Sequence, residues 1–420
     1  REKTDAFKKN VPLLEALGSK ALLDRHWFML SEAIEHDIIP DMDLTLQSLV
    51  DIDIMSQWDK VEEITTIANK EDNLLQKLTS MEQSWEEVDV FCKHYLKKGQ
   101  EADENTTHII MGTDEIYALL DDQIVLVQTM LGSPFIKYIK KQTVAFERKL
   151  VYAQELLDEW LAVQRTWMYL EPIFGSEDIM RQMPAEGRRF ALVDTFWRKN
   201  MKETVDMPRM MHIAGKEELL GQFKGASKKL DVIQKGLEEY LEVKRLAFSR
   251  FFFLSNDELL EILSQTKDPR AVQPYLNKCF EGVAKVTFRG EVNGNEKDAV
   301  IIEMQDSKGE TVPLSIPIDP NEGQNKGNVE NWLLEMQSSM RITLKDQLKM
   351  AIEQYPQLPR TEWAVNWPGQ VVLNVSMLYW TTECEQAIVE KGLAGLKVYK
   401  ENLMSQIGQI VEMVKGKMSK

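Results

Sequence analysis

The segment from Glu155 to Pro184 limits the possible folds more than any other part of the chain. Its large apolar side chains recur at spacings of four, three, four and three residues, at Leu156, Trp160, Val163, Trp167 and Leu170. This spacing places them on one face of an α-helix. Pro172 ends or kinks that helix, because proline removes a backbone donor and clashes with the preceding turn. The segment therefore predicts two buried, tryptophan-rich helices joined by a bend.

The second of these helices has a recognisable start. Ser176 suits the N-cap position, where a hydroxyl accepts a hydrogen bond from a backbone N–H. Glu177 and Asp178 follow in the first turn, where the helix dipole favours negative charge. A helical core of this kind names no function by itself.

The same segment resembles a known family. The motif W-L-x-x-Q-x-x-W-x-Y-L-E-P-I-F-x-S-E-D-I-x-x-Q-M-P, from Trp160 to Pro184, is similar to the linker of dynein heavy chains, the mechanical arm N-terminal to the AAA+ ring. L-x-D-R-H-W-x-x-L, from Leu22 to Leu30, resembles the start of that linker. The signature residues that we assign to its helical core are Trp160, Trp167, Tyr169, Pro172, Phe174 and Trp197.

A second strong match to the same family runs from Phe251 to Gly282, with the wording F-F-F-L-S-N-D-E-L-L-E-I-L-S-Q-T-K-D-P-R-A-V-Q-P-Y-L-N-K-C-F-E-G. Ser255 and Glu258 predict a capping box, and Leu254 with Leu259 predicts the hydrophobic staple that accompanies it. This local chemistry explains a sharp corner in the chain. Its signature residues are Ser255, Asn256, Asp257, Glu258, Asp268 and Pro269.

A third match lies near the end of the chain. R-T-E-W-A-V-N-W-P-G-Q-V-V-L-N-V-S-M-L-Y-W-T-T-E-C-E-Q-A-I, from Arg360 to Ile388, resembles the last linker segment before the first AAA+ module. Pro368 and Gly369 predict a turn, and residues 371–375 fit either a strand or a helix. The signature residues of this segment are Trp363, Trp367, Pro368, Gly369 and Trp380.

The hydrophobic period changes from helical to alternating at Val283. Three short runs then alternate at period two, which is typical of half-buried strands, with turn residues at Asn293–Gly294 and Lys308–Gly309. The runs are Val286 and Phe288, then Val300, Ile302 and Met304, then Val312, Leu314 and Ile316. We expect a small antiparallel β meander near residues 283–318 and a flexible connector to residue 328. The resemblance also implies a β insert at this point.

The remaining segments predict helices separated by polar loops. Gly99 to Thr107 predicts an acidic loop and no metal site, because its carboxylates lack the fixed spacing of a calcium-binding loop. In the N-terminal part, helices are expected from a start at Pro12 to a break at Gly18, from Lys20 to about Ile34, from Leu44 to Tyr95 and from Ile116 to Leu131. Farther along, helices are expected from Phe190 to Met201, from Leu219 to Tyr240 and from Val329 to Ile352. The final residues of the chain, to Lys420, are also expected to be helical.

Together these elements predict a mainly α protein with four parts. These are N-terminal helical subdomains (1–131), a central helical subdomain (132–282), the β insert with its connector (283–328), and a C-terminal helical subdomain (329–420) that leads toward the first AAA+ module. The resemblance implies an elongated, curved rod of helical bundles.

A lever of this kind needs stiff subdomains and a weak seam between them. Within a helix, a glycine such as Gly221 or Gly225 costs about 1 kcal/mol relative to alanine. We therefore place the candidate hinge at Met201, Gly215, Gly221 and Gly225. Close helix packing, or a helix that is poorly optimised, is the alternative explanation for these glycines.

The composition argues against several classes of protein. The net charge is −16 and the pI is about 5.0, which disfavours a non-specific binder of nucleic acid or of anionic membranes. Cys92, Cys279 and Cys384 lie far apart, so we expect a reducing compartment and no disulfide framework. No apolar run is long enough to span a bilayer. Because the chain opens on Arg1, we expect an excised part of a longer protein.

Motifs for nucleotide, metal and nucleophile chemistry are absent from the sequence. It contains no G-x-x-x-x-G-K-[ST], G-x-S-x-G, H-E-x-x-H or C-x-x-C, and its five histidines are scattered. His26 is either a ligand or switch, or a partly buried histidine beside Trp27. The second interpretation is favoured, because no other ligand lies at helical spacing. We expect no enzyme activity, cofactor or metal site in this chain, and no nucleic-acid or membrane partner.

The resemblance implies the lever of an axonemal dynein, and the wording S-E-D-I-M-x-Q-M-P favours an inner-arm type. The arm would bend and straighten over the AAA+ ring in response to ATP hydrolysis outside this chain, with ATP and Mg²⁺ bound in the ring. The implied partners are the ring of the same heavy chain, other axonemal dynein subunits through the tail, and microtubules through the stalk. The implied location is the cytoplasm and cytoskeleton, in the axoneme of a cilium or flagellum.

Two other classes of function stay open. A static, spectrin-like helical scaffold would suit the recurring tryptophans, but the chain shows no fixed repeat period and carries the β insert. An enzyme with an unrecognised site is the other alternative. Nucleotide binding with catalysis by the isolated chain would favour it.

Overall fold

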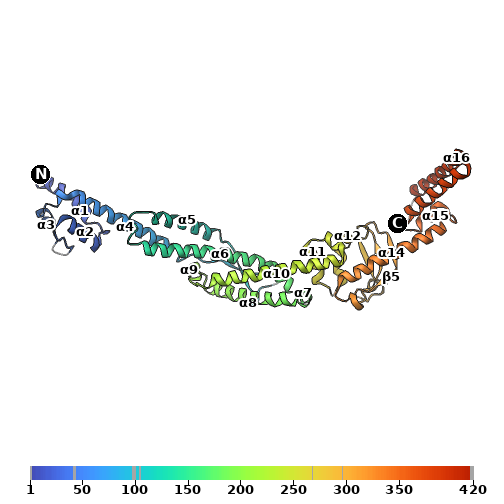
Figure 1. Cartoon of the computed structure of the whole chain (residues 1–420), viewed down its shortest axis with the longest axis horizontal. Helices are drawn as coiled ribbons and strands as arrows, with labels where there is room; N and C mark the ends of the chain where they lie inside the picture. The colour runs from blue at the N-terminus through green and yellow to red at the C-terminus, as the bar shows by residue number, and fades with distance from the viewer. Residues whose placement is uncertain are drawn as a thin grey trace. The chain divides into compact units, whose positions relative to one another are not determined.

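The computed structural model describes residues 2–40, 44–96, 101–103, 106–266, 268–295 and 297–416. It is mainly helical with small antiparallel sheets, which confirms the predicted fold class (Figure 1). The chain divides into two compact units: unit 1 holds Arg1–Glu171 and Arg188–Val232, and unit 2 holds Pro172–Gly187 and Ile233–Lys420. Three helices, α6 (Lys140–Phe174), α8 (Pro184–Asp206) and α10 (Leu219–Ala247), contribute residues to both units.

Unit 1 contains most of α6 and α8 and the first part of α10, together with further elements. The further elements are α1 (Glu2–Leu17), α2 (Asp24–Ile34), α3 (Leu46–Asp51), the 3-10 helix η1 (Ile54–Gln57), α4 (Trp58–Ser84), β1 (Cys92–His94), β2 (His108–Ile110), α5 (Asp114–Leu131) and α9 (Met210–Ala214). The N-terminal helices pack around Leu13, Leu30 and Ile54. Farther along, α5 lies beside α6, where the hydroxyl of Tyr117 donates to Asp158 at 2.6 Å.

Unit 2 combines helices with a three-stranded sheet. Its elements are α7 (Glu177–Gln182), η2 (Ser249–Phe253), α11 (Asn256–Ser264), η3 (Pro269–Tyr275), α12 (Leu276–Cys279), β3 (Lys285–Phe288), α13 (Arg289–Asn293), β4 (Ile301–Gln305), β5 (Thr311–Ile318), η4 (Gly323–Asn325), α14 (Val329–Gln354), α15 (Arg360–Val365) and α16 (Gly369–Lys415). The sheet is antiparallel in the order β3-β4-β5, as the sequence predicted. α14 covers β5, where Ser339 donates to the carbonyl of Ile316 at 2.6 Å.

The last element, α16, is a helical hairpin. Gly392 has φ 57° and ψ −138°, which breaks the helix into two arms. The second arm turns back toward α15 in Figure 1. The turn is tight, because a Cβ on Gly395 would lie 2.2 Å from the carbonyl oxygen of Ala387. Residues 371–375, which fit either a strand or a helix by sequence, lie in the first arm and are helical.

Two predicted helix boundaries at the N-terminus are wrong. Pro12 lies inside α1 and does not start a helix, and α2 begins at Asp24, not at Lys20. α1 continues through Pro12 because the neighbouring Leu13 is fully buried, which offsets the hydrogen bond that proline removes.

The helical region predicted from Leu44 to Tyr95 is wrong in its last part. α4 ends at Ser84, and the chain then forms β1, which pairs with β2. Strands of three residues are too short to show a period-two pattern. The predicted acidic loop from Gly99 to Thr107, and the predicted helical end at Lys420, lie partly outside the described residues.

The predicted alternation within the sheet is right at most positions, because Val286, Phe288, Met304, Val312 and Leu314 are buried. It is wrong at Val300, Ile302 and Ile316. Ile301 is fully buried and Ile302 is not, because the register of β4 and β5 shifts between Ile301 and Glu303. A shift of one residue moves the side chains to the opposite face. In β5, Ile316 is half-exposed whereas Ile318 is buried. No helix in the described part of the chain is both long enough and apolar enough to cross a membrane.

Candidate functional site

The tryptophans of the first signature motif form the core of unit 1. Trp160, Trp167 and Trp197 have no exposed surface. The rings of Trp167 and Trp197 stack with centroids 5.3 Å apart, and Trp160 lies 5.0 Å from Phe223 of α10. Aromatic rings bury large apolar areas and prefer such offset contacts. α6, α8 and α10 are therefore fastened together by indole packing.

The indole N–H groups of this core differ in whether they donate a hydrogen bond. Trp167 donates to Asp194 Oδ1 at 3.1 Å, whereas the Nε1 atoms of Trp160 and Trp197 have no hydrogen-bond partner among the described residues. An unpaired buried donor lowers stability by about 1–3 kcal/mol. The apolar contacts of these rings offset that cost.

The other residues assigned to this core differ in burial. Tyr169 is 39% exposed, so it is not a core residue. Pro172 is exposed near the end of α6, two residues before the helix stops. Phe174 is buried in unit 2. The helical stripe therefore ends where the predicted bend begins, and of the residues assigned to this core only the tryptophans are buried in unit 1.

The candidate hinge residues lie in four different settings. Met201 is fully buried in α8, and Gly215 caps the C-terminus of α9. Gly221 and Gly225 lie in α10, and a Cβ built on either meets no atom within 4 Å. Close packing therefore does not require glycine at these two positions, in contrast to Gly236, where a Cβ would lie 3.0 Å from Glu186 Cγ. The hinge itself stays a prediction.

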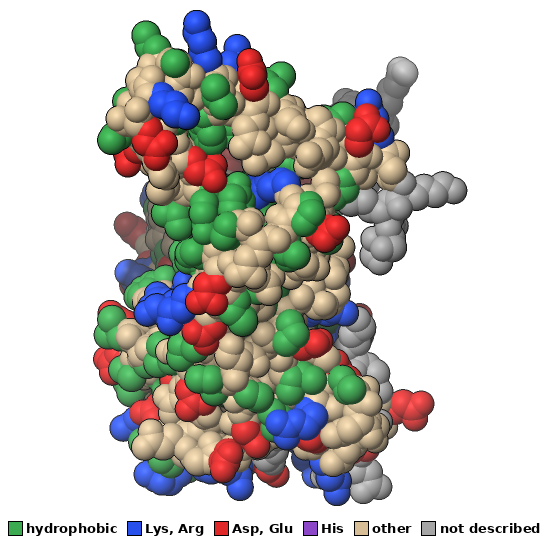
Figure 2. Space-filling model, turned by 90° about the vertical axis from the view of Figure 1, so that its right-hand side faces the viewer, with side chains coloured by type: hydrophobic (Ala, Val, Ile, Leu, Met, Phe, Trp, Pro, Cys, Tyr) green, Lys and Arg blue, Asp and Glu red, His purple; other side chains and the backbone are tan. Residues whose placement is uncertain are grey.

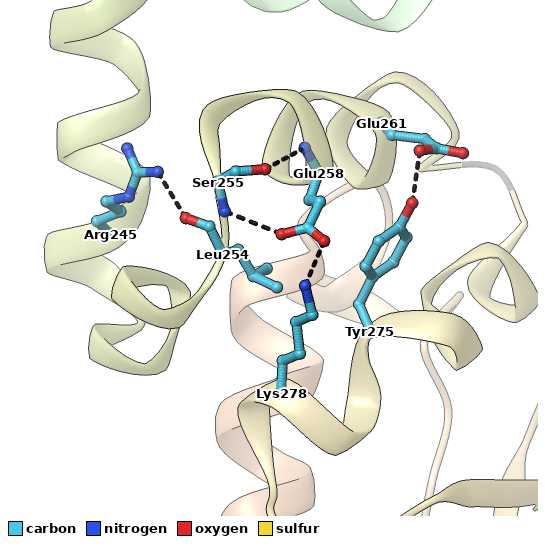
Figure 3. A network of polar contacts seen from close by, with 7 residues as sticks. All are labelled: Arg245, Leu254, Ser255, Glu258, Glu261, Tyr275 and Lys278. Carbon is cyan, nitrogen blue, oxygen red and sulfur yellow. Dashed lines mark hydrogen bonds and ion pairs between the residues drawn. The ribbon is translucent and has the colours of Figure 1, made fainter.

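The second signature motif forms the predicted capping box at the start of α11 (Figure 3). Ser255 Oγ accepts the N–H of Glu258 at 3.3 Å, and Glu258 Oε2 accepts the N–H of Ser255 at 3.0 Å. The other carboxylate oxygen of Glu258 meets Lys278 Nζ at 2.5 Å. The hydrogen bond from Lys278, with that from Ser255, holds the pKa of the Glu258 carboxyl below its ordinary value. Leu254 and Leu259, the predicted staple, are both buried.

Further contacts tie this corner to its neighbours. Tyr275 donates to Glu261 at 2.5 Å, and this bond raises the pKa of the Tyr275 hydroxyl to about 12. Arg245 of α10 donates to the carbonyl of Leu254 at 3.0 Å. Asp268 caps η3 by accepting the N–H of Arg270 at 3.1 Å. The remaining corner residues are Asn256 and Asp257, which form the first turn of α11, and Pro269, which is buried at the start of η3.

The first and second signature motifs meet in unit 2, a pairing that the sequence did not predict. Ser176 is at the N-cap of α7 as predicted, but its hydroxyl donates to the carbonyl of Ser264 at 3.0 Å instead of capping its own helix. Asp178 is buried and accepts from Thr266 at 2.9 Å and from Arg181 at 3.2 Å. The S-E-D-I motif therefore binds the C-terminal end of α11 through hydrogen bonds.

A nearly buried ion pair joins α10 to α14. Lys244 Nζ lies 2.5 Å from Glu330 Oε1, and the two side chains are 12% and 10% exposed. Breaking one partner of such a pair is strongly destabilising, because the other charge is left without compensation. This pair was not predicted from the sequence, because its members are 86 residues apart within polar helix faces.

The third signature motif surrounds an arginine with aromatic rings. Arg360 Cζ lies 4.3 Å from the ring centre of Trp363 and 4.7 Å from that of Tyr355. Trp363 is fully buried and donates to the carbonyl of Ala351 at 2.9 Å. Tyr355 also stacks on Tyr379 at 4.1 Å. This cluster fastens the base of the α16 hairpin to α14 and α15.

The remaining residues of the third motif start α16 or face outward. Pro368 precedes the helix, and the N–H of Gly369 donates to Glu310 Oε1 at 2.8 Å, which links the β5 end of the sheet to α16. Trp367 is half-buried, and Trp380 is 52% exposed. Figure 2 looks onto this end of unit 2, where hydrophobic side chains gather among charged ones. The apolar residues of α16 that are at least half exposed include Leu373, Met377, Trp380, Val389, Leu393 and Val398.

His26 is more deeply placed than the sequence indicated. It is 1% exposed, its Nδ1 accepts the N–H of Leu23 at 3.1 Å, and its Nε2 lies 3.1 Å from Glu71 Oε2. Arg25 meets the same Glu71 oxygen at 2.5 Å. The favoured interpretation, a structural histidine, fits this geometry. Glu71, on the next long helix, is the partner that helical spacing around His26 does not reveal.

Among the described residues, no group of three or more histidine, cysteine, aspartate or glutamate side chains is placed to hold a metal ion. The described hydrogen bonds and ion pairs instead cap helices and connect neighbouring elements within each unit.

Comparison with known proteins identifies the family. The model of "Dynein heavy chain, N-terminal region 2" matches residues 1–351. The chain belongs to the dynein heavy chain family. It is 40% identical over 420 residues to dynein axonemal heavy chain 1 of Mus musculus, covering all of this chain and 9% of that protein.

Other relatives are axonemal as well. Dynein axonemal heavy chain 3 of Homo sapiens is 42% identical over 417 residues, covering 99% of this chain and 10% of that protein. Dynein axonemal heavy chain 12 of Homo sapiens is 42% identical over 396 residues, covering 94% of this chain and 12% of that protein. The chain therefore corresponds to the linker region of axonemal dynein heavy chains and spans about a tenth of their length.

Proposed function

We propose that this linker region is the mechanical lever of an axonemal dynein. It bends and straightens over the AAA+ ring of its own heavy chain while ATP is hydrolysed in that ring. The family match over residues 1–351 carries the proposal. The indole core of unit 1 and the capped corner of unit 2 support it, because a lever transmits force only if its parts are stiff.

Two glycines support a soft point in this lever. Gly221 and Gly225 weaken α10 by about 1 kcal/mol each relative to alanine, yet the space around them accepts a methyl group. Alanine at both positions therefore stiffens the helix without disturbing its packing. A bending arm keeps glycine at such positions, whereas a static scaffold gains from alanine.

Energy transfer in a complete heavy chain tests the proposal. One fluorophore is placed near Lys20 and the other on the ring, and transfer is recorded with and without nucleotide. We expect a large nucleotide-dependent change, which the double variant Gly221→Ala/Gly225→Ala reduces. Gly408→Ala is the matched control, because Gly408 also lies in a helix with open space around it. If energy transfer does not change in a motor that still hydrolyses ATP, the linker region is a static strut and the proposal is wrong.

The proposed partners follow from the rest of the heavy chain. The exposed apolar side chains of α16 support packing against the AAA+ ring, since apolar patches of this kind mark interaction surfaces. Other axonemal dynein subunits bind through the tail, and microtubules bind through the stalk. ATP and Mg²⁺ bind in the ring, and this region itself has no ATPase activity. Hydrolysis of ATP by the isolated chain would contradict this lack of ATPase activity and would favour the enzyme alternative.

We place the heavy chain in the axoneme of a cilium or flagellum, in an inner arm. The axonemal relatives support the first assignment, and the wording S-E-D-I-M-x-Q-M-P supports the second. Electron tomography of axonemes that lack this heavy chain separates the two types of arm. Loss of density from inner arms is expected, and loss from outer arms alone would contradict the assignment.

A further inference from the structure

Two histidines face each other on the β1–β2 ladder of unit 1. The antiparallel register pairs His94 with His108. Because the N–H of Tyr95 donates to the carbonyl of Thr107 at 2.8 Å, the adjoining histidine pair occupies a non-hydrogen-bonded position of the ladder. At such positions the Cα atoms of facing residues are only about 4.5 Å apart and their side chains leave the same face. The backbone therefore brings both imidazoles to one place.

The two rings are as close as this register implies. Their centroids are 4.2 Å apart and their planes are inclined by 37°. Zinc binds imidazole nitrogen at about 2.0–2.1 Å, so two nitrogens on one ion are at most about 4 Å apart. The measured distance joins the ring centroids, so binding one ion requires each side chain to rotate and turn a ring nitrogen toward it. We propose that His94 and His108 form a binding site for a divalent transition-metal ion such as Zn²⁺, with water in the remaining coordination positions.

The hairpin that carries the two rings is held on the helical core. Gln164 of α6 accepts the N–H of Ile110 at 2.7 Å and donates to the Ile110 carbonyl at 2.9 Å. The ring of Tyr95 packs edge-on against Trp167, with centroids 5.0 Å apart. One anchor is therefore next to His94 in the chain, and the other is two residues after His108. A site on a fixed backbone loses less freedom when it binds an ion.

The donor set selects the class of metal. Imidazole suits zinc, copper and nickel, whereas magnesium and calcium require oxygen ligands. Cys92 shares the face of β1 with His94, because side chains alternate along a strand. Its thiol, however, donates to the carbonyl of Val90 at 3.7 Å, and no described cluster of three metal-binding side chains includes it. The site is thus a pair of histidines, open to solvent or to a donor from another molecule.

Metal titration of the whole 420-residue chain tests the site. ZnCl₂ is titrated calorimetrically, and the chain labelled with ¹³C on its histidine rings is followed by NMR. We expect one ion per chain and ring-signal changes confined to His94 and His108 among the five histidines. MgCl₂ at the same concentrations should produce neither effect.

Single substitutions identify the ligands. His94→Gln or His108→Gln should weaken zinc binding by at least about tenfold, because even loss of a supporting contact to a ligand costs that much. His36→Gln is the matched control, since His36 is exposed and far along the chain from the hairpin. Circular dichroism verifies that each variant is folded. Zinc binding that persists unchanged in both variants overturns the proposal, as does a titration of the unaltered chain that leaves the signals of both rings in place.

Discussion

The tryptophan core of unit 1 and the α11 corner of unit 2 are stabilised by different forces. In the core, Trp167 and Trp197 contribute apolar area and ring contacts that respond little to pH or salt. In the corner, Ser255, Glu258 and Lys278 contribute hydrogen bonds and an ion pair in partly exposed positions. The first kind of contact gives a large stabilisation without much directional precision. The second kind gives small increments but fixes the direction in which the chain leaves a helix.

The largest effect should come from the indole core. Trp167→Ala removes a fully buried ring and leaves a cavity, so the free energy of unfolding should fall by about 3–5 kcal/mol. Urea denaturation measures the loss. Tyr169→Ala is the matched control on the same helix, because Tyr169 is 39% exposed, and it should cost less than half as much. Equal losses in the two variants would mean that the stacked indoles are not the main support of unit 1.

The buried ion pair of unit 2 should give the next largest effect. Lys244→Met leaves Glu330 charged and nearly buried, and the free energy of unfolding should fall by about 3 kcal/mol. Lys244→Met/Glu330→Leu should recover most of that loss, because an apolar pair of similar volume needs no compensation. Urea denaturation of both variants gives the comparison. A double variant as unstable as the single one would show that the pair contributes more than mutual neutralisation.

Removing the cap of α11 should have a smaller effect. Ser255→Ala deletes the side chain that accepts the Glu258 N–H, which should lower the free energy of unfolding by about 1 kcal/mol. Ser80→Ala, at an exposed position inside α4, should leave it unchanged or raise it slightly, since alanine is the better helix former. Thermal denaturation of the two variants distinguishes capping from a general effect of losing a hydroxyl.

The smallest effect should be the pH response of the corner. Folding lowers the pKa of Glu258 through Lys278 and Ser255, so the folded state favours the ionised carboxylate. This stabilisation is complete above the ordinary glutamate value of 4.5 and is lost as the pH falls through the lowered pKa. Glu258→Gln should therefore flatten the acid limb of the stability curve. An acid limb that is unchanged in the variant would assign the response to other carboxylates.

The parts of the fold that follow from local rules were predictable from the sequence. The stripe from Leu156 to Leu170 proved buried throughout, because a helical period needs only one sequence window to reveal it. The capping box of Ser255 and Glu258 was predictable for the same reason, since both partners lie within one turn.

Contacts between distant segments were not predictable. Glu71 binds Arg25 and His26 from a helix whose exposed and buried carboxylates look alike in the sequence. Ser176 carries the residue type of an N-cap, yet its hydroxyl binds Ser264, which is 88 residues away. In both cases the partner of the side chain is a residue that only the folded structure brings close. The β1–β2 hairpin was missed because each strand is only three residues long.

The glycines of the two helices α10 and α16 carry a consequence for how this chain varies during evolution. Gly395 cannot accept even a methyl group without moving the backbone, so selection for packing alone preserves it. Gly221 and Gly225 have free space around them, and alanine there would strengthen the helix. Mutation should therefore replace these two glycines readily if stability were the only property under selection. If they persist among related chains, the property being selected is compliance.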